Sequence, residues 1–341
     1  MNRPQTLVFS GGGTRCLVFC ELLVLLENAG HLVEARSFWG TSAGALIAAL
    51  YAVCRSAVRV KSLLWDLDFS SLRNVELSVM LNMMNTWAID DGGAMLAGIT
   101  RLLDAAGTGG GDLKLRDRPG LHIVVADLNV RETLVLSAAN YPDLRIADAV
   151  RASMSLPIFL RPYVSPTGHY WVDGGVRANF PWGCVPEADR ASALGFRFSK
   201  PVFEAPRNFS EYILSMVHFD EAKKRQDVYD PNILVVPTPP FPAWFLRLRP
   251  EDYVLLVKLA HSSYEAWISR CALTTSVAST HPPETTGIPQ PSAPPCTHPP
   301  SSPPHCTVGS SGSPQASQEP SQGSFPHLLP PRSPIFRRWS F

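Results

Sequence analysis

The sequence predicts an α/β protein with a mostly parallel central sheet, and two observations support this prediction. A short apolar run at Thr6–Ser10 is followed by a glycine-rich turn and by an apolar stretch of helical length, Cys16–Asn28. A second short run, Ser37–Trp39, is followed by a second helical stretch, Ala43–Cys54. Because strand–helix–strand–helix order favours right-handed crossovers, we expect these strands to be parallel neighbours.

The rest of the folded part continues this alternation. Further strands are expected at Leu121–Asp127, Glu132–Ser137, Tyr170–Val172, Ala193–Phe198 and Ile233–Val236. Helical spacing is found at Ile146–Met154, Phe209–Gln226 and Glu251–Ile268, and residues 57–118 read as mostly helical with loops. The sequence contains no internal repeat.

The composition changes near the C-terminus. Residues 273–341 hold 16 of the 32 prolines, many Ser and Thr, and few aliphatic side chains. Such a segment buries too little apolar surface to offset the entropy of ordering it. We therefore expect one folded domain over residues 1–272 and a disordered tail over residues 273–341.

Charge and cysteine content exclude several classes of protein. A net charge of +1 argues against a surface built to bind nucleic acid. The seven cysteines lack metal-ligand spacing, and Cys16, Cys20 and Cys54 lie among apolar residues, so we expect no metal, no cofactor and a reducing compartment.

The N-terminus lacks the long apolar core of a signal peptide, and no apolar run approaches the roughly 18 residues that span a bilayer. We expect a cytoplasmic protein whose membrane contact, if any, is peripheral.

The motif with the clearest chemistry is Gly40-Thr41-Ser42-Ala43-Gly44. It has the form G-x-S-x-G between a predicted strand and a predicted helix, where a sharp turn exposes the serine as a nucleophile. Gly40 and Gly44 are expected where two backbones pass too closely for side chains. The competing interpretation is a packed helix start made of small residues.

The glycines Gly11, Gly12 and Gly13 form a second motif, between the first strand and the first helix. A Walker loop needs Lys and Ser or Thr at its end, where this chain has Arg15 and Cys16; a dinucleotide loop needs a glycine at the position of Cys16. The remaining interpretations are a tight turn, or an oxyanion hole whose backbone N–H groups receive the charge that develops when Ser42 attacks a carbonyl.

A nucleophilic serine needs a base, and the sequence favours Asp173 over histidine. Asp173 ends an apolar strand and precedes Gly174 and Gly175, so a parallel sheet would bring it to the edge that carries Ser42. Asp91 also precedes two glycines, but it follows irregular sequence and is expected to cap a helix. The histidines of the folded part that follow Ser42 lack a distinctive context and are expected to be structural: His122, His169, His218 and His261.

Taken together, these stretches resemble the patatin-like phospholipase family over about residues 5–270. The matching blocks are the loop 11–15 with its basic Arg15, the elbow 40–44, the segment 152–159, and Val172–Val176 followed by Asn179 and Pro181. The resemblance implies a three-layer α/β/α sandwich with a mostly parallel central sheet. It also implies a Ser42–Asp173 dyad that needs no histidine and no calcium, with Arg15 supporting the loop.

The implied activity is that of a carboxylic ester hydrolase acting on fatty-acyl esters of lipids through an acyl-serine intermediate, as a phospholipase A, lysophospholipase or acylglycerol lipase. One departure is Cys16, which stands where the family usually has glycine. It motivates an alternative, a weakly active or inactive module that binds lipid or protein. A third hypothesis is a Ser–Asp–His esterase that uses His218 or His261.

Two segments are candidates for contact with a membrane or lipid-droplet surface. Residues 241–249 combine aromatic side chains with two arginines and are either an interfacial patch or a loop packed on the core. The C-terminal residues 332–341 form a basic and aromatic cluster whose partner, if any, the sequence leaves open.

Overall fold

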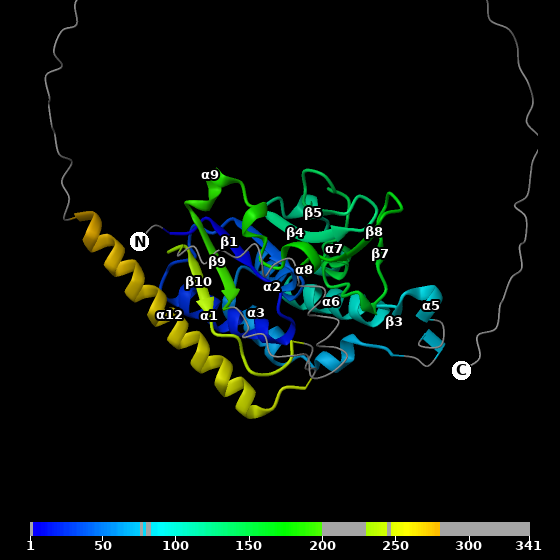
Figure 1. Cartoon of the computed structure of the whole chain (residues 1–341), viewed down its shortest axis with the longest axis horizontal. Coiled ribbons are helices and arrows are strands. Elements are labelled where there is room, and N and C mark those ends of the chain that lie inside the picture. The colour runs from blue at the N-terminus through cyan, green and yellow to red at the C-terminus, as the bar shows by residue number, and fades with distance from the viewer. Residues whose placement is uncertain (1–2, 76–77, 80–82, 200–229, 244–246, 280–341) are drawn as a thin grey trace, which may run out of the picture. The chain divides into compact units, whose positions relative to one another are not determined.

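The centre of the molecule is an eight-stranded mixed sheet (Figure 1). The computed structural model describes residues 3–75, 78–79, 83–199, 230–243 and 247–279. The strand order is β10-β9-β1-β2-β4-β8-β7, and β5 pairs with β4 as well. These strands are β1 (Thr6–Phe9), β2 (Ser37–Thr41), β4 (Leu121–Asp127), β5 (Glu132–Leu136), β7 (Tyr163–Val164), β8 (Tyr170–Asp173), β9 (Ala193–Phe198) and β10 (Ile233–Val236).

The larger part of this sheet is parallel, as the sequence predicted. Strands β10, β9, β1, β2 and β4 pair with one another in parallel, in that order, whereas β5 and β8 pair antiparallel with β4, and β7 pairs antiparallel with β8. A separate two-stranded parallel sheet is made by β3 (Ala88–Asp90) and β6 (Ile158–Leu160).

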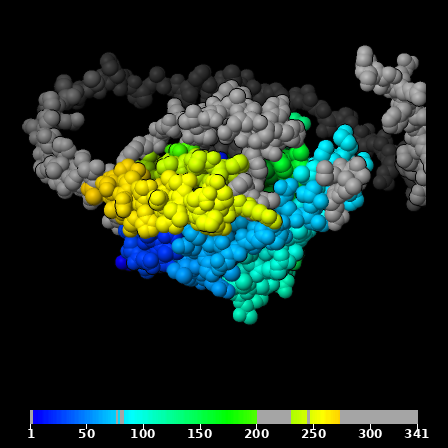
Figure 2. Space-filling view, turned by 90° about the horizontal axis from the view of Figure 1, so that it is seen from below, coloured from blue at the N-terminus to red at the C-terminus, as the bar shows by residue number. Residues whose placement is uncertain are grey.

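Helices cover the sheet on both faces. The α-helices are α1 (Leu17–Asn28), α2 (Ala43–Cys54), α3 (Ala57–Trp65), α5 (Met83–Thr86), α6 (Gly93–Ala106), α7 (Ile146–Ser153), α8 (Gly175–Ala178), α9 (Glu187–Arg190) and α12 (Pro250–Ser279). Short 3-10 helices are η1 (Gly13–Cys16), η2 (Phe69–Leu72), η3 (Gly110–Asp112), η4 (Leu115–Asp117) and η5 (Pro181–Cys184). The long helix α12 lies along the surface of the N-terminal half and packs on α1 (Figure 2).

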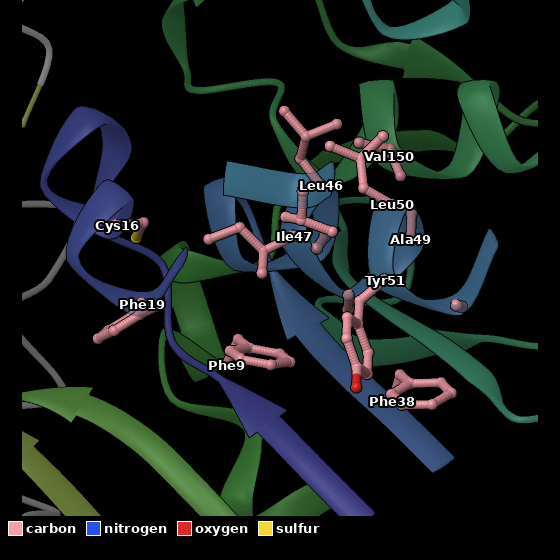
Figure 3. Packing of buried hydrophobic residues seen from close by; sticks show 14 of the residues in the cluster. Phe9, Cys16, Phe19, Phe38, Leu46, Ile47, Ala49, Leu50, Tyr51 and Val150 are labelled. Carbon is pink, nitrogen blue, oxygen red and sulfur yellow. The ribbon is translucent and has the colours of Figure 1, made fainter. Parts of the chain in front are cut away.

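Alternating side chains of the central strands separate two apolar layers. Leu7 and Phe9 belong to the large core beneath α1 and α2, whereas Val8 between them belongs to a smaller cluster with Val185 on the opposite face. The ring of Phe9 packs near Phe19 of α1, with ring centroids 6.5 Å apart (Figure 3). The three-layer α/β/α architecture expected from the sequence is therefore confirmed.

Strands β2 and β8 position the site, because both pair with the same edge of β4. Strand β5 pairs with residues 123–127 of β4, which overlaps the pairing of β2 with 121–124 and that of β8 with 125–127. Both β2 and β8 must therefore occupy the other edge, one after the other. Since β2 is parallel and β8 antiparallel to β4, their C-terminal ends meet head to head: Thr41 pairs with Val124 and Asp173 with Val125.

Several expectations need correction. Asp173 was expected on a parallel strand, but β8 is antiparallel and brings its end to β2 from the opposite direction. Asp91 was expected after irregular sequence, but strand β3 directly precedes it. Helix α12 runs from Pro250 to Ser279, past the helix end expected at Ile268, while the domain boundary at residue 272 stays a prediction. The predicted helix Phe209–Gln226 and the C-terminal cluster lie outside the described residues, and the disordered tail stays a prediction.

Candidate active site

Ser42 lies at the apex of a sharp turn between β2 and α2, as the sequence predicted. Its backbone has φ 55° and ψ −128°, in the left-handed half of conformational space that non-glycine residues rarely adopt. A side chain at Gly40 would lie 2.4 Å from the carbonyl oxygen of Gly44, and one at Gly44 would lie 2.5 Å from that of Ser10. Both positions therefore need glycine for the turn to pack under β1.

The Ser42 hydroxyl donates a hydrogen bond to Asp173, with 2.6 Å between Oγ and Oδ2. The carboxylate is 5% exposed, and its other oxygen accepts the backbone N–H of Gly175 at 2.7 Å. That bond fixes the plane of the carboxylate at the start of α8. A hydroxyl donating to a buried, oriented carboxylate is the arrangement in which the carboxylate can accept the proton of an attacking serine.

The glycine loop lies directly beside this pair. A Cβ on Gly11 would lie 3.2 Å from the Cβ of Ser42 and 2.3 Å from Oδ1 of Asn179, so Gly11 allows loop and elbow to approach. The N–H of Gly11 donates to the Asn179 carbonyl at 2.8 Å, contrary to the expectation that all three glycine amides converge on one anion. Within the described chain, the N–H groups of Gly12 and Gly13 have no backbone acceptor. These two amides remain candidates for an oxyanion hole.

Arg15 anchors the glycine loop to the segment that precedes α12. Its Nε donates to the carbonyl of Phe241 at 2.6 Å, and the backbone N–H of Thr14 donates to the carbonyl of Ala243 at 2.8 Å. The Phe241 side chain is buried in the core. For the start of the 241–249 segment, the structure thus agrees with packing on the core, while residues 244–246 lie outside the described chain.

Cys16 fits its position without distortion of the loop. Its backbone is right-handed helical, with φ −63° and ψ −10°. The side chain is buried, and its Sγ lies 3.6 Å from the Ser10 carbonyl oxygen, to which the thiol donates. Burial raises the pKa of the Cys16 thiol well above its ordinary value. The concern that this position requires glycine is therefore not supported by the backbone geometry.

The second Asp-Gly-Gly stretch serves a helix start. The carboxylate of Asp91 accepts the N–H of Gly93, the first residue of α6, at 2.8 Å. Asp90 accepts the N–H of Gly92 at 2.8 Å, and Gly92 itself has φ 79°. The N-cap of α6 is Gly92 rather than the expected Asp91, which precedes it and accepts the N–H of the first helical residue, while Asp173 is the carboxylate that contacts Ser42.

The described histidines have partners elsewhere. His122 stacks on Trp39 with ring centroids 4.0 Å apart, and His261 lies 3.4 Å from a Glu21 carboxylate oxygen. His169 Nδ1 lies 2.8 Å from Oδ2 of Asp127. His218 lies outside the described residues.

The Asp127 carboxylate at the end of β4 is 4% exposed and accepts several hydrogen bonds. Burial raises the pKa of this carboxyl. Four hydrogen bonds lower it by more than burial raises it, and their donors are His169, the N–H groups of Asn129 and Val130, and the Trp171 indole. The net result is a pKa below the ordinary value. His169 therefore belongs to a structural cluster around β4 and β8.

Sequence reasoning noted the segment 152–159 but gave its residues no role. In the structure, Ser153 at the end of α7 accepts the backbone N–H of Ser42 at 2.9 Å, and the Ser155 carbonyl accepts the N–H of Asp173 at 2.9 Å. The only available signal was the position of the segment between a helix and the strand of Asp173. Nothing in a serine after an amphipathic helix identifies such contacts.

The described residues offer neither a metal site nor a membrane span. They contain no group of three or more His, Cys, Asp or Glu side chains arranged to hold a metal ion. Among their helices, none combines the length and apolarity needed to cross a bilayer.

A sequence model described as Patatin-like phospholipase matches residues 7–183, more than half of the chain. The chain belongs to the patatin-like phospholipase family. The matched region contains both Ser42 and Asp173, together with the glycine loop.

Individual relatives are more distant. Bacillus subtilis (strain 168) YqhO, described as an uncharacterized protein, is 27% identical over 288 residues, which cover 77% of this chain and 97% of that protein. Patatin-like phospholipase domain-containing protein 6 of Mus musculus is 31% identical over 193 residues, covering 55% of this chain but 12% of that protein. The crystal structure of VipD from Legionella pneumophila aligns with a TM-score of 0.54 and 16% identity, covering 79% of this chain and 67% of that one. This last similarity supports the fold alone.

Proposed function

We propose that the protein is a serine hydrolase that cleaves fatty-acyl esters of phospholipids or related lipids. Membership of a phospholipase family supports hydrolysis of lipid esters in general. The observation that carries the specific proposal is the 2.6 Å hydrogen bond between Ser42 Oγ and Asp173 Oδ2. It joins the predicted nucleophile directly to a base, without an intervening histidine.

In the proposed reaction, the substrate ester places its carbonyl carbon near Ser42 Oγ. Asp173 accepts the hydroxyl proton as Oγ forms a bond to that carbon. The tetrahedral intermediate collapses to an acyl-serine when the alcohol portion leaves, taking the proton from Asp173. Water then attacks the acyl-serine with Asp173 again as base, which releases the fatty acid and restores the Ser42 hydroxyl.

The oxyanion that forms in each step needs hydrogen-bond donors. Gly12 and Gly13 are partly exposed and directly follow Gly11, which lies beside Ser42 but whose amide already donates to Asn179. We therefore assign the Gly12 and Gly13 amides as oxyanion donors and Gly11 to close packing. Loss of one such donor typically costs about 3 kcal/mol of transition-state stabilisation.

The direct test compares the wild-type chain with Ser42→Ala and Asp173→Asn variants. Each protein is incubated with a phospholipid, a lysophospholipid and an acylglycerol, and released fatty acid is measured, which also identifies the preferred substrate class. Both substitutions should abolish release while leaving circular dichroism and the unfolding midpoint near wild type. Full activity in either variant would refute the dyad.

The alternative, a binding module without turnover, is separated by a fluorophosphonate probe. The probe should modify wild-type Ser42, and peptide mass mapping should place the label there. A folded wild-type protein that resists labelling would support the inactive module. The helical backbone of Cys16, which cysteine adopts without strain, supports the active enzyme over this outcome. Activity that is lost on His261→Ala but kept in Asp173→Asn would instead favour an esterase with a histidine base.

A further inference from the structure

The hydroxyl of Ser153 forms a bridge between the candidate nucleophile and the central sheet. Ser153 is the last residue of α7 and is 0% exposed. Its Oγ accepts the backbone N–H of Ser42 at 2.9 Å and donates to the carbonyl of Val124 at 2.6 Å. One buried side chain thus connects α7, β4 and the turn that carries Ser42.

This bridge lies at the point along β4 where the pairing strand changes from β2 to β8. The partner of Val124 is Thr41, at the end of β2, and the partner of the next residue, Val125, is Asp173, at the end of β8. Past Thr41 the chain turns into the left-handed conformation of Ser42. The Ser153 hydroxyl satisfies both the Ser42 N–H and the Val124 carbonyl, two backbone groups that cost free energy when buried without partners.

The same short segment also holds the other member of the pair. The carbonyl of Ser155 accepts the N–H of Asp173 at 2.9 Å, while the Ser155 hydroxyl bonds to Arg151 instead. The backbones of Ser42 and Asp173 are therefore both tied to the end of α7. Of these two ties, only the one through Ser153 depends on a side chain and can be removed by substitution.

We propose that Ser153 is a positioning residue that holds Ser42 Oγ in line with Asp173 and the glycine amides. This inference rests on the proposed function, because it assigns Ser153 a part in the same reaction. A non-glycine residue with strained φ and ψ persists only when its surroundings enforce that conformation. Without the bridge, the N–H of Ser42 loses its hydrogen-bond partner, the turn after Thr41 loses one of its restraints, and Oγ moves away from the carboxylate.

The experiment uses the full chain with Ser153→Ala and Ser153→Cys, and Ser165→Ala as the matched control. Ser165 is also buried, and its Oγ accepts the backbone N–H groups of Thr167 and His169, away from Ser42. The alanine variants therefore lose a comparable buried hydroxyl. In the cysteine variant the hydroxyl is replaced by a thiol, a weaker donor and acceptor. The measurements are kcat and KM with a soluble short-chain ester, the rate of fluorophosphonate labelling, and the urea unfolding midpoint.

In Ser153→Ala, kcat and the labelling rate should fall by roughly tenfold to a hundredfold with KM within about twofold, because a misplacement of about 1 Å can cost two orders of magnitude. Ser153→Cys should fall between this variant and wild type. Ser165→Ala should keep wild-type kcat and labelling, even if its unfolding midpoint shifts as much as that of Ser153→Ala.

Two results would overturn the positioning role alone. The first is a wild-type labelling rate in either folded Ser153 variant. That result would leave the Ser42–Asp173 proposal intact. If Ser153→Ala does not fold, the cysteine variant decides. The second is an equal loss of kcat in Ser165→Ala, which would make the effect one of general stability. A wild-type protein that is neither labelled nor active overturns the proposed function itself, and the positioning role with it.

Discussion

A methyl group at Gly174 should separate the two strand ends on which the candidate dyad depends. Gly174 has ordinary helical angles, φ −60° and ψ −21°, so alanine is acceptable to the backbone. The added Cβ, however, would lie 2.4 Å from the carbonyl oxygen of Val124 and 3.1 Å from Cγ2 of Thr41. Since Cβ atoms essentially never approach other heavy atoms within 3.0 Å, the end of β8 must move away from β4 by about 0.6 Å or more.

That displacement acts directly on the hydrogen bond between Ser42 and Asp173. The bond is 2.6 Å long, and the carboxylate lies one residue before the added methyl. Overpacking of this kind typically costs about 1–3 kcal/mol of stability. A shift of up to about 1 Å between reacting groups should lower kcat by roughly tenfold to a hundredfold.

The assay measures initial rates of ester hydrolysis and urea unfolding for Gly174→Ala and for a control, Gly183→Ala. Apart from its two chain neighbours, no described residue has a heavy atom within 4 Å of a Cβ built on Gly183, so this variant should keep wild-type activity and stability within about 0.5 kcal/mol. Wild-type kcat in a folded Gly174→Ala protein would refute the reasoning. An equal loss in Gly183→Ala would show that close approach to Val124 is not the cause.

Two further predictions concern Cys16 and Asp127. Cys16→Gly should lower the free energy of unfolding by about 1–2 kcal/mol, because it removes a buried side chain and gives a helical backbone more freedom in the unfolded state. Its kcat should be unchanged. Urea unfolding and rate measurements check both expectations, and a gain in kcat would mean that cysteine does impair the loop. The pKa of Asp127 is lowered in the folded state, so its ionised form contributes stability above the unfolded pKa near 3.8, which is lost as pH falls through the folded pKa. The unfolding free energy of the wild type should therefore fall more steeply below about pH 4.5 than that of Asp127→Asn, as urea titrations at several pH values can measure; parallel pH profiles would contradict the assignment.

Local sequence was enough to predict the elements with strong patterns. Helix α2 and strand β4 begin and end where the sequence placed them, at Ala43–Cys54 and Leu121–Asp127. Both are mostly apolar segments with clear boundaries, so the local preference and the buried environment agree. The short strand β3 was missed, because its three residues have no periodicity and form a strand only through pairing with β6.

The candidate site was predicted motif by motif, since each motif states its own chemistry. Each motif can be recognised from neighbouring residues alone. The three motifs are a serine between two glycines at a strand–helix junction, a run of glycines, and an aspartate at a strand end. The contact between Ser42 and Asp173 follows from the shared edge of β4, which depends on the antiparallel direction of β8. Local patterns do not encode strand direction, so the expected parallel arrangement was wrong although the expected neighbour was right.

By itself, the sequence determined which residues can supply a nucleophile, a base and a flexible loop, because these roles follow from side-chain chemistry and short spacing. Tertiary structure alone decided that Gly11 donates its amide to Asn179, that Cys16 is accommodated, and that Ser153 bridges Ser42 to Val124. These contacts join residues distant along the chain, and their hydrogen bonds depend on how β2, β4, β8 and α7 pack together. Such packing is a property of the whole domain, which no short stretch of sequence specifies.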